Sequence, residues 1–140
     1  MRHRDITVRM AKNDDGPAVA LLMEKLDFFQ FDDWAIDWCD LEPNWLVAEH
    51  DGTVLGCIQV VPAKPIGRIE VLAVDPSLGL KNRYHVVRML TEHAVAVIGM
   101  YGAQGVSSMI PRRYETYLKG AKGTGWVEID DGAMVMKRIV

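Results

Sequence analysis

The stretch WLVAEHDGTVLGCIQVVP constrains the fold more than any other part of the sequence. Two runs rich in apolar and β-branched residues, Trp45 to His50 and Thr53 to Val61, flank the pair Asp51-Gly52. Asp and Gly accept the positive φ angles that a tight turn between antiparallel strands requires. The sequence therefore predicts a β-hairpin over residues 45–61.

A third strand and the longest helix follow this hairpin. The segment RIEVLAVDP is nearly continuous in apolar residues, which is typical of a central strand covered on both faces. From Asn82 to Tyr101 the apolar residues recur at helical spacing, and Gly99 and Gly102 can end the helix. Many folds bind a phosphate at a strand-turn-helix unit, in the loop that precedes the helix. That loop is usually rich in glycine, but here it contains only Gly79.

The other segments complete an alternating order of strands and helices. Alternation predicts a first strand at 6–10, and apolar spacing predicts a helix up to Leu26 behind the N-cap candidates Asn13, Asp14 and Asp15. Asp33 can begin a second, short helix with Trp34 and Trp38 on one face, ending before Pro43. Later elements are a strand at 105–110, a helix at 111–119 and two strands at 125–130 and 133–140. The predicted fold class is α/β (α+β), with a mixed central sheet, the order β-α-α-β-β-β-α-β-α-β-β and a single domain over residues 1–140.

Composition and charge exclude several classes of protein. The chain is 49% hydrophobic and 25% charged, with a formal net charge of -3, so it lacks the basic excess that binding to nucleic acid needs. We find no signal peptide and no membrane span, and a cytoplasmic location is expected by default. Cys39 and Cys57 are expected to be reduced, buried thiols, and the scattered histidines show no metal-ligand spacing, so we expect no disulfide and no metal.

This succession, with WLVAEHDGTVLGCIQV and IEVLAVDP ahead of a long helix, resembles the GNAT superfamily of acyl-CoA-dependent N-acyltransferases. The resemblance covers almost the whole chain. It implies that the central strand, residues 68–74, carries a bulge and diverges from the parallel strand 106–110, with pantetheine in the gap. The implied co-substrate is acetyl-CoA, whose amides would pair with the backbone of Leu72, Ala73 and Val74 and whose pyrophosphate would meet residues 79–84.

The loop at residues 79–84 departs from the family pattern. Family members usually carry Arg or Gln, then Gly, then Gly or Ala, where this chain has Gly79, Asn82 and Tyr84. Tyr84 is the most serious departure, because a side chain at a close-approach position blocks the phosphate. Lys81 and Arg83 can offset lost backbone contacts by pairing with phosphate, or they form only a solvated basic loop. The residues implied in binding CoA are Leu72, Ala73, Val74, Gly79, Leu80, Lys81, Asn82, Arg83 and Tyr84.

Acyl transfer to an amine needs a base for the amine and an acid for the departing thiolate. By its offset in the family pattern N-x-x-A-x-x-x-Y, Tyr117 is the implied acid, with Tyr114 in reserve; the alternative for Tyr117 is a packing role. Glu70, the only carboxylate in the central strand, is the candidate base; its alternative is a salt bridge or a solvent-facing position. Asp75 is expected to cap the turn.

The acceptor site in this family is built largely from the first two helices and the hairpin loops. There, residues 27–42 contain six carboxylates and five aromatic residues. This composition suits the binding of a cationic amine, and the alternative is an acidic, solvated face above an aromatic core. The implied activity is transfer of an acetyl group from acetyl-CoA to a primary amine of a small molecule or protein. The alternative is a non-catalytic module that has lost CoA binding and serves as a binding or structural partner, including as a homodimer through its final strands.

Overall fold

The computed structural model describes residues 2, 5–26, 37–110 and 115–126, which divide between two compact units, Met1–Ser107 and Ser108–Val140. The expectation of one domain stays a prediction. The elements of the first unit are β1 (Thr7–Met10), a 3-10 turn η2 (Asn13–Asp15), α1 (Gly16–Lys25), β2 (Trp45–His50), β3 (Thr53–Val61), β4 (Ile66–Val74), α2 (Leu80–Met100) and β5 (Gly105–Ser108), whose last residue belongs to the second unit. The second unit contains α3 (Glu115–Gly123).

The described strands form one mixed sheet in the order β1-β2-β3-β4-β5. The first three neighbouring pairs are antiparallel. The predicted hairpin is confirmed: β2 and β3 have the expected bounds, and Asp51 and Gly52 have φ angles of 48° and 78°. Two consecutive positive φ angles are typical of the two-residue turn that suits the twist of antiparallel strands.

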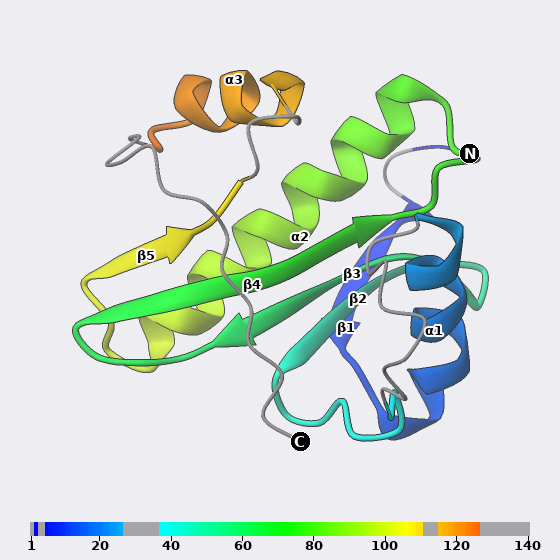
Figure 1. Ribbon diagram of the computed structural model, residues 1–140, viewed down its shortest axis with the longest axis horizontal. Coiled ribbons are helices and arrows are strands. Elements are labelled where there is room, and N and C mark those ends of the chain that lie inside the picture. The colour runs from blue at the N-terminus through cyan, green and yellow to red at the C-terminus, as the bar shows by residue number, and fades with distance from the viewer. Residues whose placement is uncertain (1, 3–4, 27–36, 111–114, 127–140) are drawn as a thin grey trace. The chain divides into compact units, whose positions relative to one another are not determined.

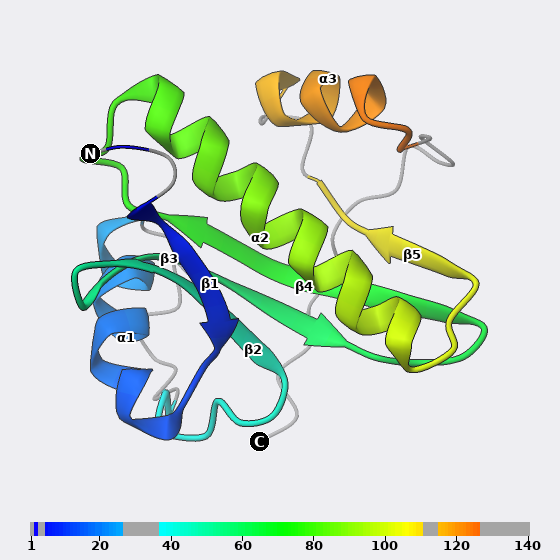
Figure 2. The same cartoon turned by 180° about the vertical axis from the view of Figure 1, so that it is seen from behind.

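Helix α2 carries the chain back to the beginning of β4. The backbone N–H groups of Gln104 and Gly105 donate to the carbonyl of Pro65, at distances of 2.7 and 3.3 Å. The starts of β4 and β5 therefore lie side by side, as in a parallel β-α-β unit. Figures 1 and 2 show β5 leaving the line of β4 from this end.

The two long helices lie on opposite faces of the sheet, as the two views show (Figures 1 and 2). On one face, α1 buries Val19, Leu22 and Met23 against a cluster that includes Val47, Cys57 and Ala73 from three strands. On the other face, α2 contributes the fully buried side chains Val86, Leu90, Ala94 and Ile98. Burial of these apolar stripes is what stabilises both helices.

The structure corrects parts of the prediction between α1 and β2. Residues 27–36 lie outside the described residues, and residues 37–42, the predicted end of the second helix, form turns instead. Asp15 directly precedes α1, but its carboxylate makes no capping bond there, because it binds Arg9 and the backbone N–H of Lys12 instead. Both differences depend on side-chain partners, Arg9 for Asp15 and Asn13 for residues 41 and 42, that helical spacing does not reveal.

Later elements agree more closely with the prediction. Helix α2 begins two residues before the expected start, and Gly102, with a φ of 89°, follows its end. Helix α3 starts at Glu115 and continues past Lys119 to Gly123, while residues 111–114 and the two final predicted strands, from residue 127 onward, lie outside the described residues. No helix in the part of the chain that the structure describes is long and apolar enough to cross a membrane.

Both cysteines are free, and their environments differ. Cys57 is fully buried in β3, as predicted. Cys39 is exposed, so the prediction of a buried thiol is wrong there, because the segment around it forms surface turns. Among residues 5–26, 37–110 and 115–126, no three His, Cys, Asp or Glu side chains group as metal ligands.

Candidate active site

A bulge interrupts the pairing of β3 with β4. Gln59 pairs with Val71 and Val60 pairs with Ile69, so Glu70 is an extra residue on β4. The bulge that the resemblance implied in the central strand is therefore confirmed. A bulge bends its strand and re-aims the side chains beside it, and bulges are common next to active sites.

The carboxylate of Glu70 has a basic partner. The Nε of Arg68 donates to Glu70 Oε1 at 2.6 Å, and the two side chains are 55% and 42% exposed. A pair this exposed contributes little to stability, because water screens it. The salt bridge that the sequence left open as the alternative for Glu70 is thus present, and its role as a base stays a prediction.

The end of β4 extends beyond its neighbour β5. β5 begins beside Pro65 and has four residues, so it advances about 13 Å along β4, at about 3.3 Å per residue. Leu72 lies six residues beyond Ile66, which is about 20 Å along β4 at the same rise. β5 therefore does not reach the backbone of Leu72, Ala73 and Val74 on the side away from β3. Peptide groups in this position can pair with the amides of an extended ligand.

The turn after β4 is held by Asp75. Its Oδ1 accepts the backbone N–H of Ser77 at 2.9 Å and the Ser77 hydroxyl at 2.8 Å, which confirms the predicted cap. Lys25, in the last turn of α1, places its Nζ 3.6 Å from Asp75 Oδ2. Burial raises the pKa of this carboxyl, but the two bonds from Ser77 and the charge of Lys25 outweigh it, so the pKa is lowered on balance.

The first turn of α2 presents free backbone donors. The first helical hydrogen bond runs from Arg83 N–H to Gly79 carbonyl at 2.9 Å, so the N–H groups of residues 80–82 have no partner within the helix. This first turn contains no acidic side chain that would neutralise its positive end. A Cβ on Gly79 would meet no atom of the described residues within 4 Å, so Gly79 is not needed for a close approach of other parts of the chain.

The side chains of this turn favour an anionic ligand. Lys81 is exposed, and Tyr84 is 54% exposed, so its ring is not packed between helix and sheet. The Nε of Arg83 is buried and has no hydrogen-bond partner in the part of the chain that the structure describes. Buried polar groups in native proteins nearly always have partners, so this donor calls for an explanation. Lys81 and Arg83 also place two cationic side chains on this turn, which suits an anionic ligand.

The other predicted site residues are only partly placed. Tyr117 belongs to the first turn of α3 in the second unit, and Tyr114 lies outside the described residues, so the choice of acid stays a prediction. In the acidic segment, Asp37, Asp40 and Glu42 are exposed. Trp38 is half-buried, edge to face with Trp45 at 5.9 Å between ring centroids.

Some residues around the site escaped the sequence analysis. Lys25 meets Asp75 across 50 positions, and no local pattern announces that contact. Ser77 had a usable signal, since Asp75-Pro76-Ser77 is a common form of a turn in which the Asp side chain binds the backbone two residues on.

Comparison with known proteins supports the fold. No protein-family model matches the sequence, and no curated protein matches it. Among solved structures, aminoglycoside N-acetyltransferase AAC(6′)-Iy in complex with CoA is similar, with a TM-score of 0.74, 17% identity and 95% of each chain covered. An aminoglycoside acetyltransferase from an uncultured soil metagenomic sample has a TM-score of 0.73, 15% identity and 98% coverage of each chain. Ribosomal-protein-alanine N-acetyltransferase from Brucella melitensis biovar Abortus 2308 has a TM-score of 0.70 at 14% identity, covering 95% of this chain and 99% of that one.

The chain therefore has the GNAT fold, as the resemblance implied. At identities this low the likeness concerns the arrangement of the chain. The activity has to be argued from the residues of the site.

Proposed function

We propose that the protein is an N-acetyltransferase that uses acetyl-CoA to acetylate a primary amine of a small molecule or a protein. The observation that carries the proposal is the first turn of α2, where the N–H groups of residues 80–82 have no partner within the helix, no side chain is acidic, and the Nε of Arg83 has no hydrogen-bond partner among the described residues. Two of the similar structures were solved with CoA, which supports CoA as the co-substrate.

In this proposal the chain binds the co-substrate along β4 and α2. The backbone of Leu72, Ala73 and Val74 pairs with the amides of pantetheine. The N–H groups of residues 80–82, with Lys81 and Arg83, hold the pyrophosphate through charge-assisted bonds in place of the missing glycines. Gly79 leaves room for this approach, while Asn82 and Tyr84 border it.

The chemistry assigns one proton to each of two side chains. The acceptor nitrogen forms a bond to the thioester carbonyl carbon, and the bond from that carbon to sulfur breaks. Glu70 takes the proton that the amine loses, directly or through water, and the hydroxyl of Tyr117 gives a proton to the departing thiolate. A tyrosine suits this step because its ordinary pKa, about 10, is close to that of an alkyl thiol.

The acceptor is an amine that residues 37–42 help to hold. Asp37, Asp40 and Glu42 offer exposed carboxylates to a cation, and Trp38 offers an aromatic surface beside them. Aminoglycosides and a ribosomal protein's alanine, the acceptors that similar proteins are named for, are both primary amines, so sisomicin and an alanine-terminated peptide are suitable first probes.

A second candidate is the non-catalytic module, with binding partners or a second copy in place of substrates. It is favoured by the three departures at Gly79, Asn82 and Tyr84 and by the ion pair that occupies Glu70. The two candidates differ in whether CoA binds.

A thermal-shift titration with acetyl-CoA and CoA separates these candidates. A ligand at 100 times its dissociation constant adds about 2.7 kcal/mol to the free energy of unfolding, so binding raises the melting temperature in a concentration-dependent way. Acetylation of sisomicin and of the alanine-terminated peptide is then measured by release of free thiol. No stabilisation by either nucleotide at millimolar concentration would contradict the enzyme and favour the module.

The binding mode has its own prediction. Replacement of both Lys81 and Arg83 by Ala should weaken CoA binding at least tenfold, because two cationic partners of the pyrophosphate are lost, each worth about 1.5 to 3 kcal/mol. Arg88→Ala is the matched control: it lies on the same helix, is exposed and pairs with Glu92 at 2.9 Å. Calorimetric titration with CoA measures both, and equal affinities in the two variants would place the phosphates elsewhere.

A further inference from the structure

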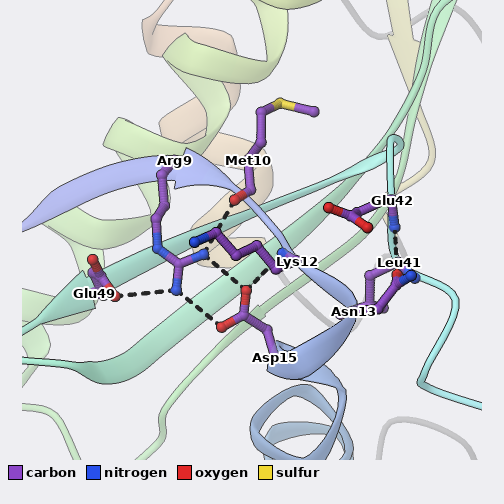
Figure 3. A network of polar contacts seen from close by, with 8 residues as sticks. All are labelled: Arg9, Met10, Lys12, Asn13, Asp15, Leu41, Glu42 and Glu49. Atoms are coloured by element: carbon purple, nitrogen blue, oxygen red, sulfur yellow. Dashed lines mark hydrogen bonds and ion pairs between the residues drawn. The ribbon is translucent and has the colours of Figure 1, made fainter.

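Asn13 holds a distant segment by two hydrogen bonds. Its side-chain Oδ1 accepts the backbone N–H of Leu41 at 2.9 Å and that of Glu42 at 3.1 Å (Figure 3). These donors lie 28 and 29 positions along the chain, in the turns that precede β2. One carboxamide oxygen thus fixes two consecutive peptide groups of a segment with no regular structure of its own.

Gly16 brings the same segment onto the start of α1. A Cβ at position 16 would overlap the backbone carbonyl of Trp38 and touch the Cα of Cys39. Only glycine allows this approach, because backbone atoms cannot yield as the end of a flexible side chain can. Residues 37–42, which we call the acceptor segment, are therefore held at one end by Asn13 and seated at the other on Gly16.

The acceptor segment packs against the same core cluster as β4. Trp38 packs against the cluster that contains Trp45 and Ala73, and Val71 packs against that cluster too. Pairing across the sheet aligns Trp45 with Gln59 and Gln59 with Val71, the residue after Glu70. The contacts of Asn13, Gly16 and Trp38 thus hold the segment on the cluster against which Val71, the residue after the candidate base, also packs.

The turn that carries Asn13 is itself anchored. Asp15 accepts two bonds from the guanidinium of Arg9, at 2.8 and 2.9 Å, and one from the N–H of Lys12 at 2.8 Å. Arg9 also donates to Glu49 of β2 at 3.2 Å (Figure 3). The support of the acceptor segment therefore extends to both β1 and β2.

We propose that Asn13 is a positioning residue of the acceptor site, which fixes residues 37–42 on the core cluster that Val71 shares and thereby sets the affinity for the amine without touching it. This inference rests on the proposed acetyl transfer. It predicts that losing the Asn13 oxygen harms acceptor binding, while the site for CoA on the far side of β4, at the start of α2, is unaffected.

The test compares three variants. Asn13→Leu removes the acceptor oxygen at similar size, Asn13→Asp keeps an oxygen that can accept both N–H groups, and Asp14→Ala is the control, an exposed neighbour in the same turn. Hydrogen exchange of the amides of residues 41 and 42 reports on the two bonds themselves. Steady-state kinetics with sisomicin and with the alanine-terminated peptide report separate KM values for acceptor and acetyl-CoA.

Asn13→Leu should speed exchange at residues 41 and 42 at least tenfold and raise the KM for the acceptor at least fivefold, with the KM for acetyl-CoA within twofold. Asn13→Asp and Asp14→Ala should match the wild type. Unchanged exchange, or faster exchange with an unchanged acceptor KM, would overturn the inference.

If the wild type binds CoA but acetylates neither probe, calorimetric titration with each probe replaces the measurement of KM. Weaker binding of a probe to Asn13→Leu than to the wild type supports the inference, and equal or absent binding contradicts it. Failure of the wild type to bind CoA would contradict the proposed function instead.

Discussion

The two cysteines show how far one side-chain type can differ with its surroundings. Burial raises the pKa of the Cys57 thiol to about 12, so almost no thiolate forms near neutral pH. The pKa of Cys39 is also raised, chiefly by a hydrogen bond with Asp37, but this thiol is exposed. Access to reagent therefore distinguishes the two thiols in the folded protein.

A thiol titration should detect this difference. In the native protein at pH 8, an aromatic disulfide reagent should modify Cys39 slowly and leave Cys57 untouched, whereas both should react in guanidinium chloride. Cys39→Ser is the control and should show no native reaction. Rapid native modification of two thiols would contradict the burial of Cys57.

Asp15 links stability to pH. The two bonds from Arg9 lower the pKa of this carboxyl below its ordinary value of 3.8, against the opposing effect of burial. A carboxyl whose pKa is lowered on folding stabilises the folded state above its unfolded pKa, and that contribution is lost as the pH falls through the folded value.

Asp15→Asn should therefore cost about 1 to 2 kcal/mol at pH 7, the lower part of the range for charged hydrogen bonds, because Arg9 is partly exposed. The difference from the wild type should shrink at pH 3. Urea unfolding at the two pH values measures it, with Asp14→Asn as an exposed control; an equal difference at both would exclude the ionised pair as the cause.

Elements built from local contacts follow from the sequence, and those held by distant partners do not. The hairpin at 45–61 is predictable because Asp51 and Gly52 alone determine its turn, and α2 is predictable because its apolar stripe is continuous. Aromatic spacing predicts the end of a helix at residues 37–42, yet the turns found there depend on Asn13 and Gly16, more than 20 residues away. Aromatic spacing alone cannot reveal such a contact.

The contact of β4 with α2 makes a prediction about packing. A Cβ on Gly67 would overlap a methyl group of Ile98, so Gly67→Ala should destabilise the fold by about 1 to 3 kcal/mol. Ile98→Val in the same chain should recover part of that loss if it makes room for the new methyl group. Gly99→Ala is the matched control, because a Cβ there meets no atom within 4 Å, and it should be neutral or stabilise α2. Chemical unfolding gives the free energy of unfolding of the wild type, Gly67→Ala, the double variant and Gly99→Ala. An unchanged free energy of unfolding in Gly67→Ala would contradict the close approach of Gly67 to Ile98.

At the scale of the whole molecule, the residues named in the proposal are distributed over both compact units. The turn at 75–79 and the start of α2 belong to residues 1–107, while Tyr117 belongs to residues 108–140. Local sequence predicted the start of α2 and the cap by Asp75. It could not predict the buried Nε of Arg83 or the contact of Lys25 with Asp75, because both depend on how separate elements pack.

The assignment of Tyr117 as the acid has its own prediction. If Tyr117 donates the proton to the departing thiolate, Tyr117→Phe removes only that donor and keeps the ring, so turnover should fall by roughly 10² to 10⁴. The affinity for CoA should hardly change, because the proposed contacts with CoA come from β4 and α2. Rapid kinetics with acetyl-CoA and the better of the two amine probes give the rate, and calorimetry gives the affinity. Tyr114→Phe, three residues earlier in the sequence, is the matched control. Full activity in Tyr117→Phe with a loss in Tyr114→Phe would transfer the role to Tyr114, and full activity in both would leave water as the proton donor.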